Sequence, residues 1–233
     1  MSRSPARPTV LLFDIDGTLM TQKGVSRKAA QDAFGVVHGR ADALDGVHFA
    51  GRTDPLIFGD GLRRLGLEVT AEALEPVFAA YLDILPGRMK TDPHVALLPG
   101  VRELLARVRA VPGFAVGLGT GNIEAGARVK VGHFDLWSAF DFGGYGSDAW
   151  DRSALIGIGA ARGAERLGLP VSDCRVVILG DTPLDVVAAH ANGAECLGVL
   201  TGGDTRDTLG AARADVIFDD LTDPAAYDWL LGA

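Results

Sequence analysis

Acidic side chains follow directly after the first apolar run of the chain. The run VLLFDIDGTL places Asp14 and Asp16 two residues apart, after a segment with the composition of a buried strand. In an open parallel sheet, ligands bind at the carboxyl ends of the strands, so a site is expected here. Two carboxylates this close together repel each other unless a cation or a shared proton relieves them. Mg²⁺ suits this pair, because it is a hard ion that prefers oxygen ligands.

Two later apolar runs also end in polar residues. LGDTPLD places Asp181 and Asp185 after one run and at the start of a helix, and LGTGN places Thr120 and Gly121 after another. The hydroxyl of Thr120 and the backbone N–H of Gly121 are groups that can bind an anion. If the three runs are neighbouring parallel strands, their tips would bring metal ligands and phosphate donors together.

The elements that must position these residues alternate along the chain. From residue 95 onward, apolar runs of strand length alternate with stretches of helical period, which is typical of an α/β fold with a parallel sheet. We predict strands at residues 9–13, 114–118, 140–142, 175–179, 196–200 and 216–218. We predict helices at residues 101–110, 123–132, 153–167, 183–191, 205–212 and 224–230.

Residues 21–93 carry a different pattern. Apolar residues recur at helical spacing in three segments, at 27–38, 54–65 and 71–85, and no strand-like run interrupts them. A helical insert between the first strand and the rest of the sheet is the simplest interpretation.

The motifs and their order resemble the haloacid dehalogenase superfamily, in the phosphoglycolate phosphatase-like branch that has an inserted helical cap. The resemblance is carried by the run from Asp14 to Leu19, by Thr120, and by Asp181 and Asp185. DxDGTL is specific, since its five fixed residues arise by chance about once in 10⁵ to 10⁶ positions, whereas GDxxxD alone is weak. The resemblance implies a Rossmann-like core at residues 1–20 and 94–233, with helices on both faces of a parallel sheet, and an all-helical cap domain at residues 21–93.

The reaction that the resemblance implies is hydrolysis of a small phosphorylated metabolite, with phosphoglycolate as one candidate. Asp14 would attack phosphorus and form an aspartyl phosphate. Asp16 would protonate the leaving oxygen and then deprotonate the water that releases phosphate. Relatives that cleave carbon–halogen bonds lack this second acid, so Asp16 selects phosphoryl chemistry.

A metal site and a phosphate site are also implied by the resemblance. Mg²⁺ would contact the side chains of Asp14 and Asp181 and the backbone carbonyl of Asp16, while Asp185 would orient the cluster. The residues implied to bind the oxygens of the transferred phosphoryl group are Thr120, Gly121 and Asn122.

The family usually has a lysine in its third motif, and here the sequence departs from that pattern. The only lysine between Thr120 and Asp181 is Lys130, inside the predicted helix after the second motif. Arg152, just before a later helix, has the more suitable position, and its guanidinium can bind two phosphate oxygens. We therefore assign Arg152 and expect Arg152→Ala to lower turnover far more than Lys130→Ala.

Each of these residues also fits an ordinary structural role. Aspartates at the end of a strand fit a turn, and Asp185 fits a helix start with Thr182 as the cap. Arg152 fits a solvated arginine at the start of a helix. The complete first motif favours the functional interpretation.

The sequence Gly51-Arg52-Thr53-Asp54 resembles a cap segment found near the active site in this branch. Arg52 is therefore a candidate for contact with the part of the substrate that is not phosphate. The same residues fit a helix start, with Thr53 or Asp54 as the cap and Pro55 in the first turn.

The composition of the chain limits the classes of partner that are expected to bind it. A net charge of -8 with only four lysines disfavours nucleic acid. The N-terminal apolar run is too short for a signal peptide or a membrane span, and the two cysteines, Cys174 and Cys196, each open an apolar run. We predict a cytoplasmic protein without a membrane partner, with both cysteines buried. Without a coiled-coil seam, a monomer or a small homo-oligomer is expected.

Two other functions are compatible with the same motifs. A phosphomutase of the β-phosphoglucomutase kind shares the motifs and a similar cap, and would return the phosphoryl group to the sugar. A non-catalytic ligand-binding protein could have kept the fold, although all the core carboxylates are present.

Overall fold

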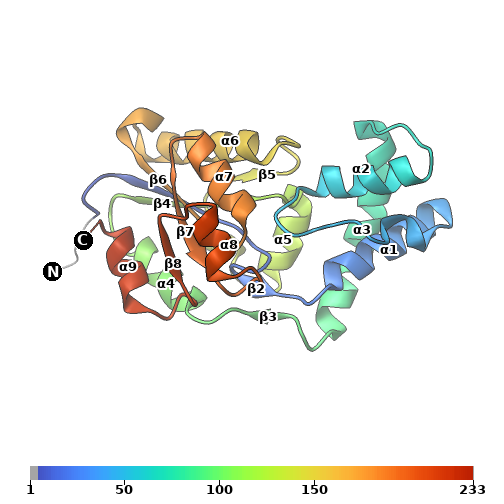
Figure 1. The fold of residues 1–233 in the computed structure, drawn as a ribbon, viewed down its shortest axis with the longest axis horizontal. Coiled ribbons are helices and arrows are strands. Elements are labelled where there is room, and N and C mark those ends of the chain that lie inside the picture. The colour runs from blue at the N-terminus through green and yellow to red at the C-terminus, as the bar shows by residue number, and fades with distance from the viewer. Residues whose placement is uncertain (1–4, 233) are drawn as a thin grey trace.

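A six-stranded parallel sheet forms the centre of the molecule in the computed structural model, which describes residues 5–232. The strands lie in the order β5-β4-β1-β6-β7-β8. Figure 1 shows the sheet with the helices around it. Their bounds are β1 Thr9–Phe13, β4 Phe114–Thr120, β5 Gly143–Tyr145, β6 Arg175–Gly180, β7 Glu195–Val199 and β8 Val216–Phe218. The predicted α/β class with a parallel sheet is confirmed.

The central strand β1 lies between the two strands that carry the other motifs. Phe13, its last residue, pairs with Leu118 of β4 on one side and with Leu179 of β6 on the other. The residues that follow these positions therefore leave the sheet at the same edge. Strands β4 and β5 lie on one side of β1, and strands β6 to β8 lie on the other. Open α/β sheets bind ligands at the point where the strand order reverses in this way.

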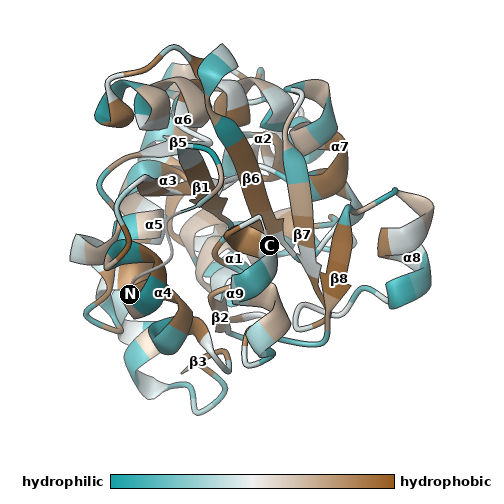
Figure 2. Cartoon of the chain, turned by 90° about the vertical axis from the view of Figure 1, so that its left-hand side faces the viewer, coloured by the Kyte–Doolittle hydropathy of each residue, from teal (hydrophilic) through white to brown (hydrophobic). Residues whose placement is uncertain are grey.

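Helices cover both faces of the sheet, because alternate residues of a strand point to opposite sides. Leu11 and Phe13 belong to one buried cluster, and Val10 and Leu12 to another, and β1 and β6 are strongly apolar in Figure 2. The helices of the α/β part are α4 Val101–Arg109, α5 Glu124–Gly132, α6 Arg152–Leu167, α7 Pro183–Ala191, α8 Arg206–Ala211 and α9 Pro224–Leu230. Short 3-10 helices lie at Trp137–Ala139 and Val171–Asp173.

The predicted insert is helical in the structure. Its elements are α1 Val25–His38, a 3-10 helix Ala41–Leu44, α2 Asp54–Arg64 and α3 Ala71–Thr91, which gather at one end of the molecule (Figure 1). Two short strands, β2 Met20–Thr21 and β3 Ala96–Leu97, pair antiparallel where the chain enters and leaves this region. The division into a core at 1–20 and 94–233 and a cap at 21–93 stays a prediction.

One predicted strand is wrong. Residues 140–142 precede the strand, and β5 is Gly143–Tyr145 instead. The apolar signal came from Phe140 and Phe142, which are both buried beside the sheet. The strand itself is rich in glycine because α6 passes close to it, so that a Cβ at Gly144 would overlap the carbonyl oxygen of Leu155.

Both cysteines are buried and free, as predicted. Over residues 5–232, none of the helices combines the length and apolar character needed to span a membrane.

Candidate active site

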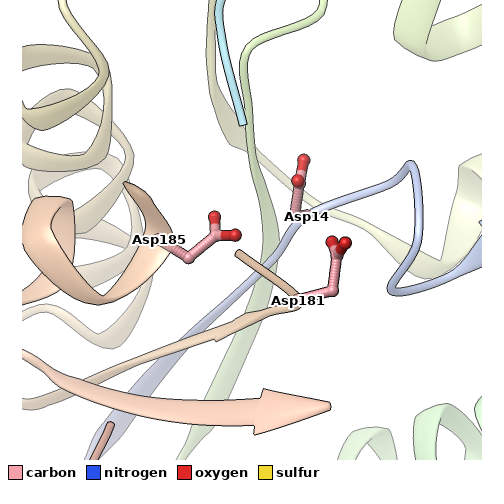
Figure 3. Close-up of side chains that lie close together, drawn as sticks. All are labelled: Asp14, Asp181 and Asp185. Carbon is pink, nitrogen blue, oxygen red and sulfur yellow. The ribbon is translucent and has the colours of Figure 1, made fainter. Parts of the chain in front are cut away.

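Three carboxylates converge at the carboxyl edge of the sheet, and we call Asp14, Asp181 and Asp185 the acid cluster (Figure 3). Asp14 follows β1, Asp181 follows β6, and Asp185 lies in the first turn of α7. All three are buried, and one oxygen from each lies within 4.8 Å of the others. The structure thus brings together side chains from widely separated parts of the sequence.

Arg152, the first residue of α6, supplies positive charge to the acid cluster. Its Nη2 lies 3.0 Å from Oδ2 of Asp14 and 2.5 Å from Oδ1 of Asp185. Burial would lower the pKa of Arg152, but the charges of Asp185 and Asp14 hold it above its ordinary value. The structure therefore places Arg152 against the predicted nucleophile, where the sequence assignment put the third-motif charge.

The carboxylate of Asp185 is occupied by other protein groups. Its Oδ1 accepts from Arg152, and its Oδ2 accepts from the backbone N–H and the hydroxyl of Thr182, at 3.0 and 2.7 Å. The helix-start interpretation of Asp185 fits these contacts, and its role in orienting the cluster stays a prediction. Asp14 and Asp181 are the members of the acid cluster with fewer protein contacts.

Negative charge exceeds positive charge in the acid cluster. Burial raises the pKa of Asp14 to about 6 against the opposing effect of Arg152. Burial also raises the pKa of Asp181, and the neighbouring charges of Asp185 and Asp14 raise it further. A bound cation would relieve this repulsion.

The donor set of the acid cluster fits a hard cation such as Mg²⁺. The acid cluster offers only carboxylate oxygens, which are the ligands that Mg²⁺ prefers. Two glycines, Gly17 and Gly202, let the backbone approach Asp181 so closely that an added Cβ at either one would overlap its carboxylate. The residues present therefore fit the predicted metal.

Asp16 lies in a second set of contacts, separate from the acid cluster. Its Oδ2 accepts from Nζ of Lys130 at 2.5 Å and from Nδ2 of Asn122 at 3.0 Å, and its Oδ1 accepts from Gln22 at 2.6 Å. Burial alone would raise the pKa of Asp16, but Lys130 and the three hydrogen bonds hold it below its ordinary value. Asp16 is thus held as an anion in the substrate-free structure.

Lys130 is a site residue that the sequence interpretation set aside. It is only 2% exposed and also donates to Oδ1 of Asn122 at 2.5 Å. One signal was present in the sequence, since Lys130 shares the apolar face of α5 with Ala127 and Val131, and a buried lysine is nearly always paired. Gln22 gave no such signal.

The second motif is held by its own side chains. Oγ1 of Thr120 accepts from Nδ2 of Asn122 at 2.8 Å and from the backbone N–H of Asn122 at 3.3 Å. The predicted phosphate donor at Asn122 therefore already has an acceptor within the motif. Thr120 is completely buried, and its hydroxyl also lowers the pKa of Asp14 through a hydrogen bond.

The turn after Asp16 is held by contacts with the loops that follow β6 and β7. Gly17 has a φ of 88°, which an L side chain would strain, and its carbonyl oxygen accepts from Oγ1 of Thr201 at 2.5 Å. Thr18 donates to Oδ1 of Asp181 at 3.2 Å. The DxDGT turn and the Asp181 loop are therefore held as one unit.

A cavity of about 490 Å³ opens between the sheet edge and the helical insert. Asp14, Asp16 and Arg152 line its floor from the α/β part, and Phe58 and Tyr81 line it from α2 and α3. Arg52, the predicted specificity residue, also lines the cavity, where its Nη1 lies 2.8 Å from Oδ2 of Asp60. The volume suits a small metabolite.

Comparison with protein families gives a match over most of the chain. A model described as haloacid dehalogenase-like hydrolase matches residues 11–190, and a second hydrolase-like model of the same kind matches residues 160–224. Both motif regions and the helical segment between them fall inside the first match.

Two curated relatives share low identity with the chain. Protein SUPPRESSOR OF QUENCHING 1, chloroplastic, from Arabidopsis thaliana is 28% identical over 96% of this chain, which spans 21% of that protein. Probable phosphatase IndB from Dickeya dadantii is 27% identical over 68% of this chain and 67% of its own length. The chain thus spans about a fifth of the first relative.

Solved structures share the fold at lower identity. A predicted phosphatase from Clostridium acetobutylicum has a TM-score of 0.68 at 20% identity and covers 97% of this chain and 99% of its own. CbbY from Rhodobacter sphaeroides, in complex with phosphate, has a TM-score of 0.69 at 17% identity and covers 95% and 99%. At these identities the likeness establishes the fold.

Proposed function

The chain belongs to the haloacid dehalogenase-like hydrolase family, and we propose that it is a Mg²⁺-dependent phosphatase that hydrolyses a small phosphorylated metabolite through an aspartyl phosphate on Asp14. The observation that carries the proposal is the separation of two carboxylates. Asp14 lies in the acid cluster beside Arg152, whereas Asp16 is bound by Lys130, Asn122 and Gln22. Two carboxylates in such different surroundings suit two different roles.

In the first step, an oxygen of Asp14 forms a bond to phosphorus as the bond to the leaving oxygen breaks, and the leaving oxygen takes a proton from Asp16. Because Asp16 is an anion before substrate binds, it must gain that proton in the complex, where the charge of the phosphate favours the protonated form. Arg152 holds Asp14 at 3.0 Å and orients it toward the substrate. When bound, Mg²⁺ would be held by Asp14, Asp181 and the backbone carbonyl of Asp16, and it would offset the repulsion between the nucleophile and the phosphate.

In the second step, Asp16 takes a proton from water, and that water attacks phosphorus to release phosphate and regenerate Asp14. The contacts from Lys130, Asn122 and Gln22 leave Asp16 as an anion, the form that a base requires. Thr120 and Gly121 are proposed to bind phosphoryl oxygens with Arg152, and Arg52 to contact the leaving group.

The proposal is tested with a panel of phosphorylated metabolites that includes 2-phosphoglycolate. We expect phosphate release that depends on Mg²⁺ and stops on addition of EDTA. No release from the panel or from p-nitrophenyl phosphate, above the level of an Asp14→Asn variant, would support the non-catalytic binding protein. Conversion of a hexose 1-phosphate to the 6-phosphate without net phosphate release would support the phosphomutase. A cytoplasmic location and a monomer or small homo-oligomer stay predictions.

Asp16→Asn is expected to separate the two steps. With p-nitrophenyl phosphate the leaving group needs little protonation, so Asp14 should still be phosphorylated, while hydrolysis of the phosphoenzyme should slow by about 10²-fold or more. Rapid-quench kinetics should then show a burst of p-nitrophenol close to one per active site. A variant without a burst and with unchanged steady-state turnover would contradict the role of Asp16.

Gly202→Ala is expected to weaken Mg²⁺ binding about 10- to 100-fold, because the added methyl would displace the carboxylate of Asp181. The measurement is the Mg²⁺ titration by calorimetry, together with the Mg²⁺-induced rise in Tm. Gly210→Ala in α8 is the matched control, since an added Cβ there meets no atom within 4 Å. Equal Mg²⁺ affinities for both variants would place the metal elsewhere.

A further inference from the structure

The turn that leads into α2 lies against the loops that carry the catalytic residues, and we call residues 51–54 the crossing segment. Oγ1 of Thr53 does not cap its own helix but donates to the carbonyl oxygen of Trp150 at 2.8 Å. Nη1 of Arg152 donates to the carbonyl oxygen of Gly51 at 3.2 Å. The crossing segment therefore contacts the same arginine that binds Asp14.

Asp54 makes the most direct of these contacts, with the second motif. Its backbone N–H donates to the carbonyl oxygen of Gly121 at 2.7 Å, and its Oδ2 accepts from the backbone N–H of Ile123 at 2.9 Å. Ile123 is the N-cap residue of α5, so the carboxylate also lies at the positive end of that helix. One residue of the insert thus binds the backbone on both sides of Asn122.

Asn122 links this contact to the chemistry. Its side-chain Nδ2 donates to Oδ2 of Asp16, and its side-chain Oδ1 accepts from Nζ of Lys130. A shift of the backbone at residues 121–123 would move all of these atoms together. Asp54 is therefore connected to Asp16 through Ile123 and Asn122.

Two glycines let neighbouring backbone segments approach the second motif closely. A Cβ at Gly121 would overlap the carbonyl oxygen of Arg52, and a Cβ at Gly146 would overlap the carbonyl oxygen of Gly121. Glycine at these two positions allows the backbones to come together. The placement of Asp54 also has an electrostatic cost, because burial raises its pKa to about 6 despite the nearby charge of Lys130.

We infer that Asp54 is a positioning residue, which holds the 121–123 backbone, and through it Asn122 and Asp16, in the arrangement used for turnover. The hydrogen bond from the Ile123 N–H is the contact that does this, and it forms only when the crossing segment lies on the second motif. The effect on turnover rests on the proposed phosphatase function, whereas the ordering of the loop does not.

The direct test is the rate of hydrogen exchange at the Ile123 amide, measured by NMR or in short peptic fragments. The exchange is measured in the presence of Mg²⁺ and inorganic phosphate. Asp54→Ala should speed this exchange about tenfold or more, since a hydrogen bond to a charged group is lost. Asp54→Asn keeps an oxygen that can accept and should restore most of the protection. Glu72→Ala is the matched control, because Glu72 lies exposed in the first turn of α3 and bonds within that turn.

Turnover gives a second readout with an identified substrate. Asp54→Ala should lower kcat about tenfold, with Asp54→Asn intermediate and Glu72→Ala unchanged. Unchanged exchange at Ile123 in Asp54→Ala would overturn the inference, and so would equal exchange in the Ala and Asn variants. If no phosphorylated substrate is found, the exchange experiment still decides the inference, so the two failures are distinguishable.

Discussion

Asp14→Asn is expected to lower Mg²⁺-dependent turnover by at least about 10⁴-fold, because removal of a covalent nucleophile takes away the only route to the intermediate. The amide has nearly the same shape as the carboxylate, and Arg152 can still donate to its oxygen. Folding should therefore be preserved, and burial of one charge fewer in the acid cluster should not lower Tm.

The measurement is steady-state phosphate release, combined with mass spectrometry of acid-quenched enzyme. Wild-type protein should give a phosphorylated peptide that contains Asp14, and the variant should not. Asp42→Asn is the control, since Asp42 is exposed, is paired with Arg40 and is not among the residues that line the cavity. Turnover of Asp14→Asn within tenfold of wild type would mean that water attacks phosphorus directly.

The architecture could be predicted from sequence because the strand signals were local. The strand at Thr9–Phe13 is found as predicted, since the continuous apolar run at residues 10–13 is typical of a strand covered on both faces, and all five residues are buried. β5 was misplaced because its own residues are mostly glycine and the apolar signal lies just before it. Strand propensity contains no information on the helix backbone that passes within contact distance of Gly144.

The end of α3 shows a second limit of local signals. The predicted helical segment ends at residue 85, and Pro86, which follows, disfavours a continuing helix. The helix continues to Thr91, and both Leu85 and Met89 are buried on either side of the proline. Tertiary packing thus outweighs the loss of one backbone hydrogen bond.

In the candidate site, the residues at strand tips and Arg152 could be predicted, whereas the helix residues that contact the second motif were not predicted. Asp14, Thr120 and Asp181 follow apolar runs, and parallel strands bring such positions to one edge. Lys130 and Asp54 reach the second motif from helices whose rotation and tilt depend on the whole fold. Their spacing in sequence carries no information on those angles.

Arg152→Ala is expected to lower turnover about 10³-fold, far more than Lys130→Ala. Loss of Arg152 leaves three buried carboxylates without the cation that lies 3.0 Å from Asp14 and 2.5 Å from Asp185. Loss of Lys130 leaves Asp16 with two further hydrogen bonds, from Asn122 and Gln22. The surroundings of the nucleophile therefore change more than those of the acid–base residue.

Arg152→Ala breaks ion pairs with two buried carboxylates, which costs about 3–5 kcal/mol of stability, whereas Lys130→Ala breaks a pair whose carboxylate is one third exposed. Activity must therefore be compared in fully folded protein. Urea unfolding curves identify the conditions under which each variant is fully folded. The kcat is then measured under those conditions at saturating Mg²⁺. Arg152→Lys should recover only part of the activity, because an ammonium group cannot span Asp14 and Asp185 as the planar guanidinium does. Equal losses for Arg152→Ala and Lys130→Ala would refute the assignment of Arg152, since the two cations would then support the reaction to the same extent from different carboxylates.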